Sequence, residues 1–195
     1  MGQMNINDLY RNVIQVSGVQ YDPESRQYFV FDAQDVVFSI KYNAFTGEYK
    51  MLLHPNFQQT LQKYGFDPET NKPKFELVYN WVEFQNQIYK IITSHETNVK
   101  NIFDQLVPYV DVSFKMHKGF ETYIAHGFGD KFYCVGYNPD TKQYGFQRYE
   151  PMISMYDYLG IPSSSKPDYQ KLYDRTKQMY LTKIVIENMQ NLEIY

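Results

Sequence analysis

The feature that most restricts the fold of this 195-residue chain is a similarity between its two halves. When the sequence is shifted by 95 positions, residues 27–66 align with residues 122–161 without a gap. The aligned identities are Tyr28 with Tyr123, Asp35 with Asp130, Tyr42-Asn43 with Tyr137-Asn138, Thr46 with Thr141, Tyr49 with Tyr144 and Gly65 with Gly160. This pattern predicts a tandem duplication of a unit of about 95 residues.

Shorter matches on either side extend the similarity over nearly the whole chain, at spacings of 96 and 94. The matches at 96 are residues 5–8 with 101–104 and Val16-Ser17 with Val112-Ser113, and those at 94 are Lys72-Pro73 with Lys166-Pro167 and Tyr79 with Tyr173. Because the spacing changes so little, we interpret all of these matches as traces of the same duplication.

The best-matched segment has the chemistry of a hairpin turn. It reads Tyr-Asn-x-x-Thr-x-x-Tyr at residues 42–49 and again at residues 137–144. Asparagine at the first turn position can accept a backbone N–H, and Gly47 suits a residue at positive φ. The two tyrosines that flank each turn are therefore expected to face each other as a cross-strand pair. Residues 21–28 have the same form and predict a second hairpin in the first unit.

The fold class predicted for each unit is α+β, with one helix, an antiparallel four-stranded meander and two further helices. The first helices are expected near 5–12 and 100–108, and strict alternation of apolar and polar residues over 110–117 predicts the strand that follows the second of them. Further strands are expected at 27–32, 35–42 and 48–53, and at 121–127, 131–137 and 143–149. A short helix then begins at Pro55 or Pro151 and ends near Gly65 or Gly160, and a long helix follows Lys72-Pro73 or Lys166-Pro167.

The two repeat units are predicted to span residues 4–97 and 98–195. The joint at residues 95–100 is too short to act as a flexible linker. The first long helix carries two adjacent apolar stripes, whereas the second is thinner and has Arg175 where the first has Trp81. We therefore expect the first long helix to be buried on two sides, and the two units to pack together as one rigid body.

Composition and charge exclude several classes of protein. The net charge is −3 and the pI is about 5.8, so the basic surface typical of nucleic-acid-binding proteins is missing. A single cysteine excludes an internal disulfide and a multi-cysteine zinc site. No signal peptide is recognisable, and no apolar run approaches the ~18 residues that span a bilayer. A soluble, cytoplasmic protein that binds no cofactor and no membrane is expected.

Three residues of the second unit are the candidates for a catalytic or metal site. His117, His126 and Cys134 fall on three successive predicted strands, where a Cys–His pair or a metal site would need them to meet. Alternation places His117 on the polar face. The first unit has Phe31 and Ser39 at the positions of His126 and Cys134, so the trio is not part of the repeated framework. We interpret the trio as incidental and predict no catalytic, metal-binding or cofactor-binding residue.

The surplus of aromatic residues is the remaining functional signal. The chain contains 20 Tyr and 14 Phe, and so many phenol groups are difficult to bury with every hydroxyl bonded. Many tyrosines are therefore expected at the surface, where Tyr is enriched in recognition sites. The predicted partner-binding residues are Tyr42, Tyr49, Tyr137, Tyr144, Tyr149, Tyr156 and Tyr158.

The leading functional hypothesis is a non-enzymatic module that binds another protein through an aromatic, mildly acidic surface. Residue usage typical of AT-rich genes favours a phage or mobile-element accessory protein that inhibits a host defence protein. A bacterial immunity or antitoxin-type protein is an alternative in the same class, and a homo-oligomer is compatible with either. Two alternatives from other classes are a nucleic-acid-binding protein that stacks bases on sheet tyrosines and an enzyme that uses Cys134 and His126. The charge balance makes nucleic acid the less favoured partner.

Overall fold

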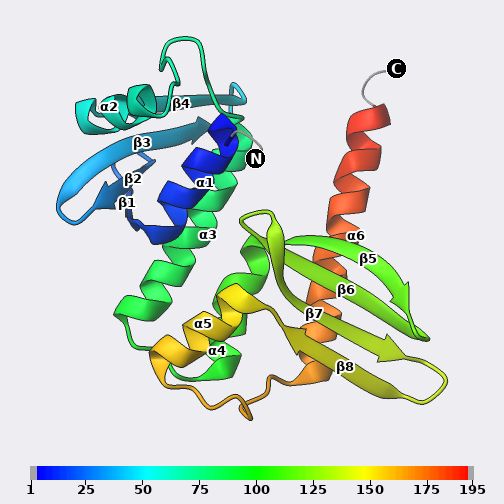
Figure 1. Cartoon of the computed structure of the whole chain (residues 1–195). Helices are drawn as coiled ribbons and strands as arrows, with labels where there is room; N and C mark the ends of the chain where they lie inside the picture. The colour runs from blue at the N-terminus through cyan, green and yellow to red at the C-terminus, as the bar shows by residue number, and fades with distance from the viewer. Residues whose placement is uncertain (1–3, 193–195) are drawn as a thin grey trace. The chain divides into compact units, whose positions relative to one another are not determined.

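The computed structural model describes residues 4–192, with side chains up to residue 189 (Figure 1). Residues 193–195, which the second predicted unit includes, lie outside this range. The chain separates into two compact units between Lys90 and Ile91, within the last turn of α3 (Phe75–Thr93), a helix whose other residues all belong to the first unit. The repeat boundary between residues 97 and 98, and the rigid packing of one unit against the other, stay predictions.

The first unit has one helix, an antiparallel sheet in the order β1-β2-β3-β4 and two further helices. Its elements are α1 (Ile6–Val16), β1 (Gly18–Asp22), β2 (Gln27–Asp32), β3 (Asp35–Asn43), β4 (Glu48–Leu53), α2 (Pro55–Lys63) and α3 (Phe75–Thr93). All three helices contact the same face of the sheet. Tyr10 of α1 and Phe57 of α2 pack on Phe38, and Tyr79 of α3 packs on Tyr28.

The second unit repeats this order around its own sheet, β5-β6-β7-β8 (Figure 1). Its elements are α4 (Val99–Leu106), the 3-10 turn η1 (Val107–Tyr109), β5 (Asp111–His117), β6 (Phe120–Gly127), β7 (Asp130–Asn138), β8 (Gln143–Arg148), α5 (Glu150–Leu159) and α6 (Tyr169–Leu192). Phe103 of α4 packs on Tyr133, and Tyr173 of α6 packs on Tyr123. Two four-stranded meanders, each flanked by helices, confirm the predicted fold class.

The strand pairing agrees residue by residue between the two sheets. Every pair of facing residues in β2–β3 and β3–β4 has its counterpart 95 positions later in β6–β7 and β7–β8. The sheets even share a bulge, at Val30/Phe31 in the first and at Ala125/His126 in the second. A bulge changes the face to which the following side chains point, so an equivalent bulge is not expected by coincidence. This agreement supports the predicted duplication.

The predicted hairpin turns form as expected. The side chain of Asn43 accepts hydrogen bonds from the backbone N–H groups of Phe45 and Thr46, at 2.9 and 3.3 Å. Asn138 makes the equivalent two bonds, at 3.0 and 3.3 Å. Gly47 adopts the predicted positive φ of 71°, and Lys142 takes the same conformation in the second unit at 58°. The tyrosines at the two ends of each turn face each other, as predicted.

The alignment of the first helices and strands at a spacing of 96 is wrong. Val16 ends α1 and Ser17 caps it, whereas the residues matched to them lie inside β5. The facing pairs show that Val19 of β1 corresponds to Val112 of β5, a spacing of 93. The capping residues agree, because Asn5 caps α1 and Asn98 caps α4. The matches at a spacing of 96 are therefore coincidental.

Candidate functional site

An aromatic cluster lies between the sheet and the long helix of each unit. In the first unit the Tyr79 ring of α3 lies 5.6 Å from Tyr28, 6.0 Å from Tyr42 and 5.6 Å from Tyr49. A fifth ring, Tyr21, lies 4.8 Å from Tyr28 in a tilted arrangement. These five tyrosines, the first aromatic cluster, place two of the predicted partner-binding residues against a helix.

The second aromatic cluster has an equivalent residue at every position. The ring of Tyr173 in α6 lies 5.5 Å from Tyr123, 5.8 Å from Tyr137 and 5.9 Å from Tyr144. Phe114 replaces Tyr21 and lies 5.3 Å from Tyr123. Because edge-on and tilted ring pairs add to the energy of burial, the two clusters serve first as cores that join helix to sheet.

The central tyrosine of each cluster has a raised pKa, and in both cases burial is the largest cause. A carboxylate comes second, that of Glu83 beside Tyr79 and that of Glu121 beside Tyr173. The Tyr173 hydroxyl donates a hydrogen bond of 3.0 Å to Glu121. The two glutamates come from different elements, α3 and β6. Each unit therefore places a carboxylate beside its central tyrosine in its own way. Each cluster keeps its central hydroxyl protonated and bonded.

The predicted tyrosines of the two hairpins remain partly accessible. Tyr42 is 40% exposed, and Tyr49, Tyr137 and Tyr144 are half-buried. Loss of hydration raises the pKa of Tyr144, and the carboxylate of Asp174 adds to this. Each ring thus packs on a neighbouring ring and stays partly accessible.

The three other predicted tyrosines have different environments. Tyr158 on α5 is 68% exposed. Tyr149 is half-buried, and its hydroxyl lies 3.7 Å from the Cys134 sulfur. Tyr156 is fully buried beneath the Arg148 guanidinium, which lies 4.4 Å from its ring centre, and its hydroxyl has no hydrogen-bond partner in the described part of the chain. Burial raises the pKa of Tyr156 to about 12.

The structure places His117 and His126 of the predicted trio at opposite ends of one hairpin, and Cys134 on the neighbouring strand β7. His117 faces Phe120 at the turn end of the β5–β6 hairpin, while His126 lies at its other end. His126 makes a hydrogen bond of 3.1 Å with the Ser113 hydroxyl, a partner that the sequence did not indicate. Among residues 4–192, no group of three or more His, Cys, Asp and Glu side chains is placed to hold a metal ion.

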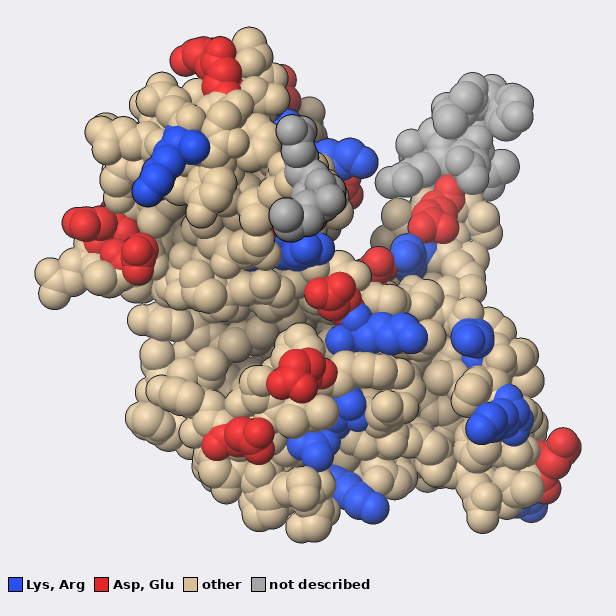
Figure 2. All heavy atoms as spheres, in the orientation of Figure 1, with Lys and Arg blue, Asp and Glu red and all other residues tan. Residues whose placement is uncertain are grey.

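Charged groups of both signs are interspersed over the visible surface (Figure 2). Large uncharged areas lie between them, and no extended patch carries a single sign of charge. This distribution agrees with the near-neutral charge balance of the sequence.

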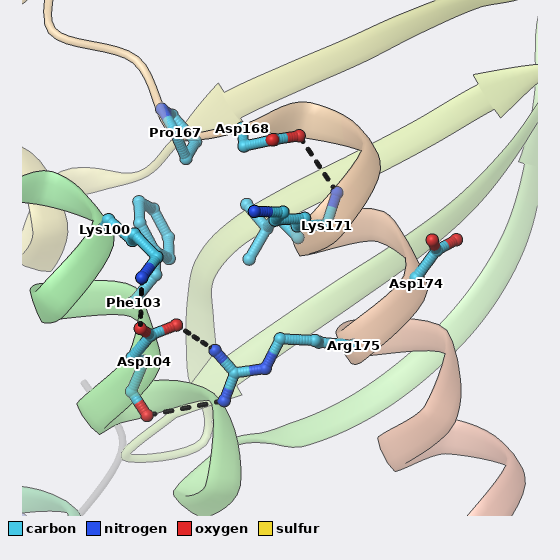
Figure 3. A pocket seen from close by; sticks show the side chains of 9 residues that line it. Lys100, Phe103, Asp104, Pro167, Asp168, Lys171, Asp174 and Arg175 are labelled. Atoms are coloured by element: carbon cyan, nitrogen blue, oxygen red, sulfur yellow. Dashed lines mark hydrogen bonds and ion pairs between the residues drawn. The ribbon is translucent and has the colours of Figure 1, made fainter.

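A cavity of about 210 Å³ lies between α4 and α6 in the second unit (Figure 3). Its apolar part consists of Phe103, Leu172 and Pro167, of which the first two are almost fully buried. The remaining lining residues are Lys100, Asp104, Asp168, Lys171, Asp174 and Arg175. The cavity therefore combines an apolar base with a rim of three positive and three negative side chains.

The rim is largely fixed by its own contacts. Asp104 forms an ion pair with the Arg175 guanidinium, which also donates to the Asp104 backbone oxygen at 3.5 Å. The Lys100 ammonium lies 3.8 Å from the same carboxylate. Asp168 accepts the backbone N–H of Lys171 at 3.1 Å and so caps α6. Figure 3 shows these contacts around the opening, with α4 on one side and α6 on the other.

The equivalent place in the first unit has different residues. Asn7, the counterpart of Lys100, bridges α1 to the start of α3 by accepting the backbone N–H of Lys74 at 2.9 Å. Buried Trp81 stands where the second unit has Arg175. The sequence signalled this difference through Trp81 and Arg175, but the meeting of α4 with α6, some seventy residues later, was not predictable from it.

Comparison of the chain with protein-family models, with curated proteins and with solved structures found no match. None of the helices in the described residues has the length and apolar character needed to cross a membrane. The cavity and the clusters are therefore interpreted from their own chemistry.

Proposed function

We propose that this chain is a non-enzymatic protein-binding module, and that an apolar side chain of its partner enters the cavity between α4 and α6. The cavity is the observation that carries the proposal. Its volume of about 210 Å³ exceeds the ~150 Å³ of an apolar protein cavity that holds benzene, so one aromatic ring fits. An inhibitor or an immunity protein belongs to this functional class.

The residues around the cavity are of the kinds found at a hot spot of a protein–protein interface. Hot spots are apolar pockets that take a large side chain, surrounded by groups that exclude water. Phe103 and Leu172 supply the base, and the ion pair of Asp104 with Arg175 borders it. Because these charges are already paired, they need not be desolvated alone when a partner covers them. A paired rim supports recognition rather than proton transfer.

The predicted tyrosines extend this surface. The carboxylate of Asp174 lines the cavity and also contributes to the raised pKa of Tyr144. Tyr144 faces Tyr137 in the adjacent strand, with ring centres 4.8 Å apart. A partner seated in the cavity would thus meet the half-buried edges of these two rings, which offer contact area at low entropic cost.

The test compares Lys171→Glu, which changes the exposed rim, with Leu77→Glu at the equivalent position of the first unit. Immobilised wild-type protein and both variants are exposed to extracts of cells that carry the gene. Partner retention is quantified by mass spectrometry. We expect Lys171→Glu to lower retention of the partner about tenfold, which corresponds to ~1.4 kcal/mol, and Leu77→Glu to leave it unchanged. Equal retention by all three proteins contradicts the proposal.

A second measurement needs no knowledge of the partner. N-acetylphenylalaninamide serves as the probe of the cavity, and methyl resonances are followed by NMR. We expect the Leu172 methyl groups to shift on titration, and to shift less in a Lys171→Trp variant, in which the new indole competes for the opening. A probe that leaves the Leu172 resonances unmoved shows that the cavity does not accept an aromatic ring.

A further inference from the structure

The strand β5 is an open edge whose apolar side is only partly covered by α6. It pairs with β6 along one side and with no other strand of residues 4–192. On its helix-facing side, Phe114 is 40% exposed and Met116 is 56% exposed. The equivalent edge of the first unit is shorter, because β1 ends before Pro23, which stands at the position of Met116. Proline blocks strand pairing, so the first edge is protected where the second is open.

Helix α6 extends beyond this edge. The Lys183 ammonium lies 2.7 Å from the Asp111 carboxylate at the start of β5, so the helix crosses the edge strand at this point. Residues 184–192 then continue past the sheet, as Figure 1 shows. Nine residues at 1.5 Å each reach about 13 Å, nearly the width of three strands spaced ~4.8 Å apart.

The overhanging part of α6 is apolar and exposed. Val185, Ile186 and Met189 of the overhang are 49–57% exposed, and Leu181, just before it, is 42% exposed. In the equivalent helix α3, Ile91 occupies the position of Val185 and is fully buried. The exposed apolar face of α6 projects past the unpaired edge of β5. It could therefore pack on further strands that are added to the sheet beside β5.

We propose that this continuation is a second copy of the same chain, paired antiparallel along β5 about a twofold axis at Phe114. In this register all seven residues of β5 find partners: Phe114 faces its own copy, Val112 faces Met116 of the partner copy and Ser113 faces Lys115 of the partner copy. The two α6 overhangs then lie antiparallel on the same face of one eight-stranded sheet.

The backbone of β5 has the correct groups free. The hairpin between β5 and β6 turns through Lys118 and Gly119, whose φ values of 51° and 85° define a two-residue turn of the mirror-image type. The pair that closes such a turn, His117 and Phe120, is hydrogen-bonded, and the bonding alternates along the strand. The N–H and C=O groups of Val112, Phe114 and Met116 therefore point outward, and these residues pair with each other in the proposed register.

The charges along β5 favour antiparallel self-pairing. The strand begins with Asp111 and ends with Lys115, His117 and the adjoining Lys118. About the twofold axis, Asp111 of one copy lies opposite His117 of the other and diagonal to Lys115, within the range of cross-strand interaction. A parallel arrangement would instead place like charges side by side. The edge is thus complementary to itself in one orientation.

The test uses cysteines that cross-link in this register alone. Cys134 is first replaced by Ser, the residue that the first unit has at this position. Ser113→Cys and Lys115→Cys are then prepared as separate proteins. Facing residues that are not hydrogen-bonded have Cα atoms ~4.5 Å apart, inside the 4.4–6.8 Å range of disulfides. We expect mild oxidation to give a disulfide dimer when the two proteins are mixed, and neither protein to cross-link by itself.

Other outcomes overturn the proposal. Self-linking of Ser113→Cys or of Lys115→Cys indicates a different register, and a mixture that stays monomeric indicates that β5 does not pair with its copy. A surface covered by a different protein gives this monomeric result as well. Sedimentation equilibrium of the unmodified chain adds a second readout, in which Val185→Glu raises the dimer Kd at least about tenfold. Lys171→Glu leaves dimerisation intact, so failure here is separate from failure of the proposed protein-binding cavity.

Discussion

The two units use one backbone framework but place their polar groups differently inside it. In the first unit the ring pair that joins helix to sheet is Tyr10 with Phe38, at 5.4 Å, and in the second it is Phe103 with Tyr133, at 5.2 Å. The two positions are equivalent, so the hydroxyl has moved from the helix to the strand. The pair keeps its edge-on geometry. This exchange shows that the framework fixes ring positions and leaves the chemistry at their edges free to change.

The consequence is that a hydroxyl and its partner change together. Tyr133 is fully buried and its hydroxyl lies 2.8 Å from that of Thr176, which is also fully buried. The first unit has Phe38 and Val82 at these positions, both fully buried. Each unit therefore satisfies its own core, one with a hydrogen-bonded pair and the other with an apolar pair. In the core, the residues that differ between the units differ as matched pairs. In α4, α6 and β5, the differences accompany a cavity and an unpaired strand edge in the second unit alone.

The largest effect is expected from substitutions in the aromatic clusters. They test whether the two clusters contribute equally to the free energy of unfolding. Tyr173→Ala and Tyr79→Ala each remove the ring that contacts three others, and we expect each to cost about 3–5 kcal/mol of unfolding free energy. Denaturant unfolding followed by circular dichroism measures the loss. The variants Tyr173→Phe and Tyr79→Phe keep the rings, serve as controls, and should lose much less. A cost for Tyr79→Ala below that of its Phe control would show that the first cluster is not a core.

Much of the framework was predictable because it is set by local chemistry. The hairpins follow from Asn43 and Asn138, whose side chains bond the turn backbone, and the alternation of apolar and polar residues over 110–117 marks the strand β5. The clusters show in the sequence as matched tyrosines. The sequence did not predict that Tyr79 and Tyr173 pack against the strand tyrosines. A contact between a helix and a sheet depends on tertiary packing, which no local pattern specifies.

The remaining features depend on contacts between distant segments. The spacing of 93 at the first helices was hidden by the chance identities at 96. The sheet-facing helix residues that do correspond, such as Tyr10 and Phe103, differ in identity because either ring can fill the same place. The burial of Tyr156 was also missed, since an isolated tyrosine gives no sign of the Arg148 guanidinium that covers it. The cavity needs α4 and α6 to approach each other, which no local pattern specifies.

A smaller effect is expected from substitutions in the core pair of Tyr133 and Thr176. Thr176→Val removes the partner of the buried Tyr133 hydroxyl, and an unpaired buried hydroxyl costs about 1–3 kcal/mol. Adding Tyr133→Phe recreates the pair that the first unit carries at Phe38 and Val82, and we expect the double variant to regain most of the loss. A double-mutant cycle from denaturant unfolding gives the coupling energy. Simple additivity of the two changes would show that the two residues are not coupled.

A third effect compares the two buried phenols through pH. Burial raises the pKa of Tyr10 and of Tyr133 above the usual value near 10. Because the folded-state pKa is the higher one, this contribution to stability is complete below pH ~10 and is lost as the pH rises toward the folded-state pKa. Each unit should lose up to about 1.4 kcal/mol per pH unit from its buried phenol above that point.

The measurement is the pH dependence of unfolding between pH 8 and pH 11, with tyrosine ionisation followed by absorbance. Tyr10→Phe should reduce the alkaline slope of the first unit alone, and Tyr133→Phe together with Thr176→Val that of the second alone. Identical slopes in wild type and variants would mean that other groups control alkaline unfolding.

The smallest effect concerns the carboxylate beside the first cluster. Burial raises the pKa of Glu83 above its usual value near 4.5, and the hydrogen bond from Tyr79 opposes this shift without cancelling it. Stability tied to the protonated form is therefore present below that value and lost as the pH rises through the folded-state pKa. Glu83→Gln keeps an acceptor for Tyr79 and removes the charge, so we expect a gain of about 0.5 kcal/mol at pH 7 that disappears below pH ~4. Lys177→Gln, at the equivalent position of α6, is the control for a charge removed without this burial, and thermal unfolding at both pH values decides between them.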